Sequence, residues 1–435
     1  MLAKKILTPF QKFISIESFS GILLIITTVI ALIWANSPFS ESYVSLWNSE
    51  IGFRFIGFEL YKPLILWIND LLMAIFFFVI GLEIKREFLI GELNTTKKMV
   101  FPLVGALGGM LLPVLLFFLI NQNPETAKGW GVPMATDIAF ALAILTLLGD
   151  KVPMALKIFL TAFAIIDDMA AVLIIAIFYS ANIQIMMLIF ALVLLAVLYF
   201  LSYKSIYSKT LLVAVGAVVW YLFLKSGIHP TIAGVLLAFS VPLQQKINTK
   251  TFIASLNTIS ENIKNNPDKT KPVLSKVQIE EINNLEGWTT KYQSPLQYLE
   301  QRLHNWVAYF IIPLFALANA GVVLHTGIPL DQPLIVTIII CLVAGNSIGI
   351  TSIIFLAKKL QWIVIPNKIT MRHIIGVSFI AGVGFTMSIF IASLAFATRP
   401  EYLDSAKIGI LIGSLASGLI GYFILAMKPN KHIKT

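Results

Sequence analysis

TAFAIIDDMAAVLIIAIFY, residues 161–179, places two adjacent carboxylates, Asp167 and Asp168, in an apolar run that extends from Ala155 to Tyr179. Such a run is long enough to cross a bilayer, for which about 20 apolar residues suffice. A carboxylate at the bilayer centre costs about 3 kcal/mol on insertion scales, so it usually handles an ion or a proton. The two carboxylates repel one another, and a bound cation competes with protons for their oxygens. The segment therefore predicts a membrane site that trades protons for cations.

The composition extends this interpretation to the whole chain. Of its 435 residues 58% are hydrophobic and 12% charged, and the mean hydropathy is +0.86, which excludes a soluble globular protein. We expect one all-α, multi-pass integral membrane domain over residues 1–435. Its apolar runs predict about twelve transmembrane helices, at roughly 18–36, 63–84, 99–120, 129–149, 155–179, 183–203, 209–226, 229–245, 304–322, 333–357, 374–397 and 406–427.

The distribution of Lys and Arg predicts the orientation. With the N-terminus cytoplasmic, the inside connections hold most of the basic residues, for example Lys97, Lys98, Lys358 and Lys359, and the outside connections hold few. Both termini are therefore expected in the cytoplasm. The net charge of +10 is scattered over these inside loops, so we expect a lipid bilayer and no nucleic acid as partner.

Two spans are interrupted at mid-membrane. Residues 129–137 (GWGVPMATD) crowd two glycines and a proline before Asp137, and residues 382–386 (GVGFT) place two glycines before a threonine. Interrupted spans in matching positions of two halves predict an inverted-repeat transporter with two unwound, crossing helices around a midplane site. Glycine also serves close helix packing, which is the alternative interpretation for the second break.

Few acids lie inside the spans, so each is informative. Asp137 lies beside backbone oxygens freed by the break and could complete an oxygen cage for a hard cation such as Na⁺ or Li⁺. Alternatively, it only balances the half-helix dipoles. Asp70, in WINDLLMA, is more often a packing or mouth residue than a functional one.

Two segments depart from the pattern of spans and short loops. Residues 51–60 (IGFRFIGFEL), around Gly52 and Gly57, predict a small extracellular β-hairpin. Residues 246–300 form a polar cytoplasmic insertion that contains NNPDKTKP, a turn or disordered patch, and a short helix around Ser275 to Glu286. This stretch is either a tolerated insertion or a segment that regulates the protein or binds a partner.

Four motifs carry a family resemblance that covers nearly the whole chain. GWGVPMATDIAFALAILTLLG (129–149), LKIFLTAFAIIDDMAAVLIIAIFY (156–179), PLFALANAGV (313–322) and GVGFTMSIFIASLAF (382–396) resemble the NhaA family of Na⁺/H⁺ antiporters. The resemblance implies a secondary transporter of the bacterial inner membrane, not an enzyme, that uses no cofactor. It would export cytoplasmic Na⁺ or Li⁺ for external protons by alternating access, regulating internal pH and sodium. It also suggests a homodimer through residues 51–60.

The same resemblance assigns residues. Asp167 and Asp168 match the family's pair that binds the cation and protons, so Na⁺ is expected there, and Thr136 and Asp137 match its unwound-helix site. GLEIKREF (81–88) matches a cluster linked to pH response, with Glu83, Arg86 and Glu87 as its charged candidates. Glu300 in YLEQRLHNW and His229 in KSGIHPTIAG match further positions of that kind. Individually, loop-edge charges of this kind are usually only solvated.

The chain departs from the family pattern at two places. The 246–300 insertion is longer than the family's usual connection. Where the family carries a lysine in a GKPLGI-like motif, this chain has GNSIGI (345–350), with Asn346 at the lysine position. No other Lys or Arg lies between Arg302 and Lys358 in the sequence.

Two other function classes compete with an antiporter. An intramembrane aspartyl protease needs two Asp on facing helices, commonly with a GxGD motif, and no GxGD occurs in the sequence. A passive cation channel needs a continuous pore with several weak sites. The paired breaks beside adjacent acids favour a gated midplane site instead.

Overall fold

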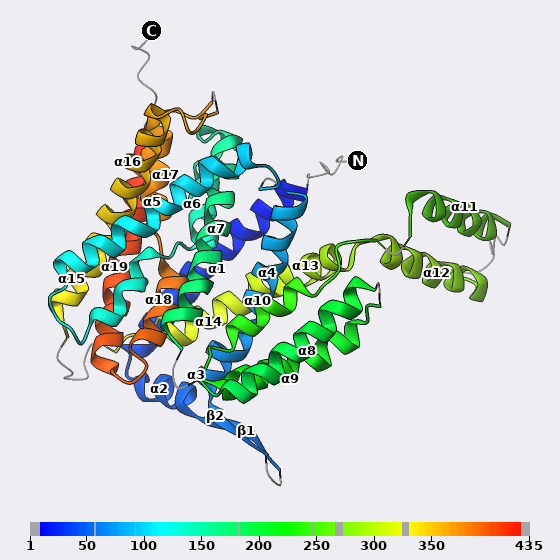
Figure 1. The fold of residues 1–435 in the computed structure, drawn as a ribbon, viewed down its shortest axis with the longest axis horizontal. Helices are drawn as coiled ribbons and strands as arrows, with labels where there is room; N and C mark the ends of the chain where they lie inside the picture. The colour runs from blue at the N-terminus through cyan, green and yellow to red at the C-terminus, as the bar shows by residue number, and fades with distance from the viewer. Residues whose placement is uncertain are drawn as a thin grey trace.

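The computed structural model describes residues 9–427 apart from 56–57, 92, 181–182, 205, 246, 266–272, 324–329 and 367. The predicted cytoplasmic ends of the chain, the Gly57 turn and most of NNPDKTKP therefore lie outside the described residues. Within the described part the chain is a bundle of helices with one small hairpin, as the sequence predicts (Figure 1).

The helices follow one another with short connections. In the first half they are α1 (Pro9–Ala35), α2 (Ser40–Asn48), α3 (Leu64–Trp67), α4 (Met73–Leu89), α5 (Thr96–Ile120), α6 (Ile138–Leu147), α7 (Met154–Phe178), α8 (Ile185–Tyr203), α9 (Lys209–Ser226) and α10 (Thr231–Phe239). In the second half they are α11 (Thr249–Asn265), α12 (Lys276–Tyr292), α13 (Pro295–Trp306), α14 (Ile312–Asn319), α15 (Gln332–Ile340), α16 (Asn346–Lys359), α17 (Met371–Ala381), α18 (Phe385–Ala395) and α19 (Pro400–Ala426).

Nine helical segments of the described chain are long and apolar enough to cross a membrane, and the bent pair α17 and α18 can count as a tenth. These segments match ten of the predicted spans. The other two, 229–245 and 304–322, correspond to the shorter helices α10 and α14. The second of these continues from α13 through a π-helical turn, η4 (Val307–Ile311).

Two more π-helical turns interrupt long helices. η1 (Ile68–Leu72) joins α3 to α4 and contains Asp70, and η5 (Cys341–Gly345) joins α15 to α16 directly before Asn346. Single π-helical turns inside α-helices are frequent at functional sites. The sequence offered no signal for them.

The two predicted breaks are present and lie against one another. The first consists of a 3₁₀ helix, η2 (Ala127–Met134), and an extended stretch at residues 135–137 before α6. The second separates α17 from α18, which are bent by 40°. The backbone N–H of Asp137 donates to the carbonyl of Val383 at 2.7 Å, so the two interruptions meet. The predicted pair of unwound, crossing helices is confirmed.

Close packing brings α16 onto α5. A Cβ on Gly108 or on Gly349 would collide with the backbone carbonyl of the other residue, so the two helices approach closely at this crossing only because both residues are glycine. The contact holds the start of α16, and Asn346 with it, against α5.

The predicted hairpin is confirmed as β1 (Glu50–Phe55) and β2 (Phe58–Pro63), which pair antiparallel with Ile51 opposite Lys62. It projects from one end of the bundle (Figure 1). The side chains of Ile51, Phe53 and Tyr61 are more than half exposed on it.

The polar insertion is more helical than the sequence predicts. α11 was not expected, and α12 extends beyond the predicted 275–286 helix to Tyr292. Ser275 and Gln278 form a reciprocal capping box that begins α12. The ring of Phe252 stacks on that of Tyr292 at 4.2 Å, and the two helices form a hairpin that extends away from the bundle (Figure 1). Charged residues obscured this amphipathic pairing in the sequence.

Candidate functional site

Asp167 lies on α7 and points at the first break. Its Oδ2 accepts a hydrogen bond from the backbone N–H of Thr136 at 2.8 Å. Its Oδ1 is buried and has no hydrogen-bond partner. Asp167 and its neighbour Asp168 are 1% and 3% exposed, so both carboxylates are inside the bundle, as the sequence predicts.

Thr136 connects this carboxylate to the second break. Its side-chain oxygen donates to the carbonyl of Ala381, the last residue of α17, at 2.8 Å. The predicted site residues Thr136 and Asp167 are thus joined directly, with the end of α17 as a third element of the same site.

The carboxylate of Asp137 accepts hydrogen bonds from both interrupted helices. Its Oδ1 accepts from the N–H of Phe140 at 3.0 Å and caps α6, and its Oδ2 accepts from the N–H and the hydroxyl of Thr386 at 3.1 and 2.6 Å. Gly384 permits this approach, because a Cβ there would collide with the carbonyl of Ala135. Both oxygens of Asp137 are therefore engaged, an arrangement that compensates the positive ends of two helices.

Asn346 is fully buried at the start of α16. Its Nδ2 donates to the carbonyl of Pro133 at 3.0 Å and lies 3.4 Å from the carbonyl of Leu342. Its Oδ1 is buried without a partner. The position that carries a lysine in the resembling family therefore contacts the same broken segment as Asp167, through a neutral amide.

The pH-response candidates form a separate cluster. Arg86 on α4 lies 3.0 Å from both oxygens of Glu300 on α13 and 2.7 Å from an oxygen of Glu87. Burial raises the pKa of Glu300, and the adjacent Arg86 opposes this shift. Glu83 lies one turn earlier on α4, buried, with Oε1 lacking a hydrogen-bond partner.

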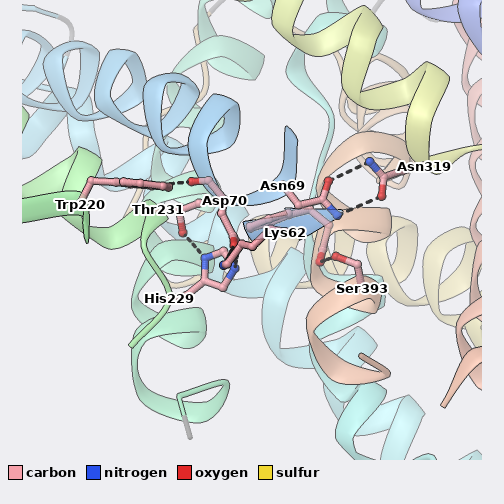
Figure 2. Close-up of polar contacts among 9 residues, drawn as sticks. Lys62, Asn69, Asp70, Trp220, His229, Thr231, Asn319 and Ser393 are labelled. Atoms are coloured by element: carbon pink, nitrogen blue, oxygen red, sulfur yellow. Dashed lines mark hydrogen bonds and ion pairs between the residues drawn. The ribbon is translucent and has the colours of Figure 1, made fainter. Parts of the chain in front are cut away.

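His229 is not part of that cluster. Figure 2 shows it beside Asp70, whose Oδ1 lies 3.6 Å from Nε2 of His229. Nζ of Lys62 from strand β2 lies 2.7 Å from the other oxygen of Asp70, and Nδ1 of His229 bonds with the hydroxyl of Thr231 at 2.8 Å. His229 and Asp70 thus belong to a network that links the hairpin to the bundle.

The sequence did not predict the pairing of several polar side chains, among them Asn69 with Asn319 and Glu17 with His304. The amides of Asn69 and Asn319 bond reciprocally at 3.2 and 2.9 Å, which Figure 2 also shows. An oxygen of Glu17 on α1 lies 3.3 Å from Nε2 of His304 on α13. Glu17 lies directly before the first predicted span, at 18–36, and was therefore not counted among the acids inside spans. The described residues contain no group of three or more His, Cys, Asp or Glu side chains placed to hold a metal ion.

Comparison with known proteins decides the family. Residues 11–425 match the family model described as Na+/H+ antiporter 1. The chain belongs to this Na⁺/H⁺ antiporter family. It is 45% identical to the Na(+)/H(+) antiporter NhaA of Oleidesulfovibrio alaskensis, over 97% of this chain and 94% of that protein. It is 43% identical to the Na(+)/H(+) antiporter NhaA of Wolinella succinogenes, over 96% of the chain and 92% of the relative. With that of Helicobacter pylori strain 26695 the identity is 42%, over 98% of this chain and 97% of that relative.

Membership confirms the resemblance drawn from the four motifs. A multi-pass, helical membrane protein with two crossed interruptions fits an antiporter family of this kind. The comparisons give no support to the channel or protease alternatives.

Proposed function

We propose that this antiporter exports Na⁺ or Li⁺ from the bacterial cytoplasm across the inner membrane in exchange for external protons. Asp167 and Asp168 bind the cation and the protons in turn. The site that they form opens alternately to the cytoplasm and to the outside. The observation that carries this proposal is the position of the buried Asp167, bonded directly to the segment where two interrupted helices cross. Such crossings at mid-membrane hold ions in secondary transporters.

Asp137 and Thr136 support the site in this proposal. Asp137 compensates the two helix ends, and Thr136 joins Asp167 to α17, so cation binding at the aspartates is coupled to the relative position of both breaks. The charged cluster of Arg86, Glu87 and Glu300, with Glu83 beside it, adjusts exchange to pH, and His229 contributes through Asp70.

The hairpin β1–β2 joins two copies of the chain in our proposal, through an exposed strand edge and the exposed side chains of Ile51 and Phe53. Replacement of residues 51–62 by a short flexible linker is expected to yield monomers in detergent, as measured by light scattering. A dimer that persists without the hairpin would place the interface elsewhere.

Reconstitution into proteoliposomes tests the exchange. A Na⁺ gradient is expected to drive protons in the opposite direction. A proton gradient is expected to drive Na⁺ uptake against the Na⁺ concentration gradient, and this uptake should stop when the proton gradient is collapsed by a protonophore. Na⁺ movement only down its own gradient, without protons moving in the opposite direction, would indicate a channel. Flux of neither ion would contradict the proposal.

A further inference from the structure

We propose that Asn346 is a ligand of the transported cation: its Oδ1 and Oδ1 of Asp167 bind the ion together. The inference rests on the proposed function, because it requires a cation at the aspartate pair. It adds a neutral, selectivity-determining oxygen to that site, in place of the lysine that the NhaA pattern has there.

The surroundings of Asn346 fix which end of its amide is the oxygen. The two groups near Nδ2, the carbonyls of Pro133 and Leu342, are both acceptors. Only an NH₂ group can donate to them, so the amide cannot be turned around. Its oxygen must point elsewhere, and in the fully buried side chain that oxygen meets no donor.

A buried acceptor without a donor is rare in folded proteins and calls for a specific explanation. Here a second such atom, Oδ1 of Asp167, is held by the same piece of chain. Asn346 is tied to Pro133 and Asp167 to Thr136, only three residues apart on the interrupted segment. Carboxylate and amide oxygens are the ligands that hard cations such as Na⁺ and Li⁺ prefer.

The chemistry of the side chain separates this site from one with a lysine. A lysine ammonium can only donate hydrogen bonds and repels a cation, whereas an amide oxygen accepts. A cation that enters this site therefore gains an oxygen ligand from Asn346. With a lysine at this position, the cation would have to displace a positive charge.

Four variants in the full-length protein test the ligand. Asn346→Leu keeps the branched shape and the number of heavy atoms but has neither the oxygen nor the Nδ2 donor, and Asn346→Asp keeps oxygens but loses the Nδ2 donor to Pro133. Ser347→Ala is the matched control, because the neighbouring hydroxyl donates to the carbonyl of Val343 within the helix. Asp168→Asn tests the proposed function separately. Binding of radioactive Na⁺ to purified protein is measured at one alkaline pH, together with the ratio of Na⁺ to Li⁺ exchange in proteoliposomes.

The Na⁺ dissociation constant is expected to rise about tenfold or more in Asn346→Leu. Replacing a residue that only supports the ligands of a metal site already lowers metal affinity by about this factor. In Asn346→Asp it should stay near or below the unchanged value, with an altered Na⁺ to Li⁺ ratio, and Ser347→Ala should match the unmodified protein. Should Asn346→Leu not fold, Asn346→Ala carries the same expectation.

Three results would overturn the inference. Unchanged or tighter Na⁺ binding in Asn346→Leu would mean that Oδ1 only accepts a hydrogen bond from protonated Asp167. Equally weakened Na⁺ binding in Asn346→Asp and Asn346→Leu would mean that Asn346 acts only through its hydrogen bond to the carbonyl of Pro133. An unaltered Na⁺ to Li⁺ ratio in Asn346→Asp would remove its role in selectivity. In each case loss of exchange in Asp168→Asn would leave the proposed aspartate site standing, and normal exchange in that variant would reject the assignment of the cation to the aspartate pair.

Discussion

The carboxylate of Asp137 accepts two hydrogen bonds from Thr386, the second residue of α18, while it caps α6. One side chain therefore holds the first turns of two helices that are more than two hundred residues apart in the sequence. Because each helix begins with a partial positive charge, a single negative group between them stabilises both. Movement of one break relative to the other must alter these bonds.

Asp137→Ala is expected to weaken the apparent Na⁺ affinity or slow turnover, since two helix ends lose their compensating charge. It also leaves buried N–H and hydroxyl donors unpaired, at a cost of about 1–3 kcal/mol each, so the melting temperature in detergent should fall. Thr386→Val is the control: it removes the hydroxyl bond alone and should retain exchange. Unchanged affinity and rate in Asp137→Ala would give Asp137 a purely structural role.

Asp168→Asn should abolish Na⁺/H⁺ exchange and leave a folded, inserted protein, because the amide has a similar volume and removes a charge from the membrane interior. Asp331→Asn is the matched control. Asp331 caps α15 through a bond to the N–H of Leu334, and Asn is an equally good cap. Dye-reported proton flux in proteoliposomes measures both. Near-normal flux in Asp168→Asn would remove it from the ion pathway.

Much of this site could be predicted from the sequence, because its signals are local. Two patterns can be recognised within a few residues of sequence: the adjacent acids in an apolar run, and the glycines and proline clustered before Asp137. The pairing of distant residues could not be predicted. Lys62 with Asp70 and Glu17 with His304 are joined only by the packing of separate helices, and an acid at a span end looks solvated until a partner covers it.

The secondary structure was likewise predictable where it depends on local sequence and not where it depends on distant contacts. Apolar length was enough to place the long spans, whereas α11 and the π-helical turns depend on interactions that no short pattern encodes. α11 is stabilised by its neighbour, through the hydrogen bond of Asn262 to Glu281 at 2.7 Å and the stacking of Phe252. A polar, charged stretch read alone predicts a loop.

Glu300→Gln tests the charged cluster through its pH dependence. The pKa of Glu300 is raised, so folding favours its protonated form: the stability it contributes is complete below its ordinary pKa and is lost as pH rises through the raised one. Glutamine resembles the protonated acid. The difference between Glu300→Gln and the unmodified protein, in exchange rate and in melting temperature, should therefore vanish at acid pH and grow as pH rises.

Exchange and melting temperature measured from pH 4 to pH 9 give the comparison. Glu286→Gln on α12 is the control and should follow the unmodified profile. Arg86 and Glu87 also face Glu300, and Glu83 lies nearby, so Arg86→Gln should alter the profile as well. A constant difference across the whole range would exclude titration of Glu300 as the cause.

Removal of the helical hairpin α11–α12 should leave exchange intact. Its two ends meet at the bundle, where Asn248 and Ser294 line one cavity of about 570 Å³, so a short Gly/Ser linker can replace residues 249–292. The site residues lie on other helices. Na⁺/H⁺ exchange and its pH profile are measured in parallel with the full chain. Loss of exchange in a folded deletion variant, or a displaced profile, would instead make the insertion regulatory.

The final prediction concerns electrogenicity. Asn346 replaces a lysine that could carry one of the exchanged protons, and an amide carries none. Both aspartates are present and buried, and each can take a proton when Na⁺ leaves, so we expect two protons per Na⁺ and a net charge moved in each cycle. Such a charge couples to the membrane potential at about 2.3 kcal/mol per 100 mV. A K⁺ diffusion potential imposed across proteoliposomes should therefore accelerate Na⁺/H⁺ exchange in one polarity and slow it in the other. Rates indifferent to the sign and size of that potential would show that one proton is missing from the cycle and that exchange is electroneutral.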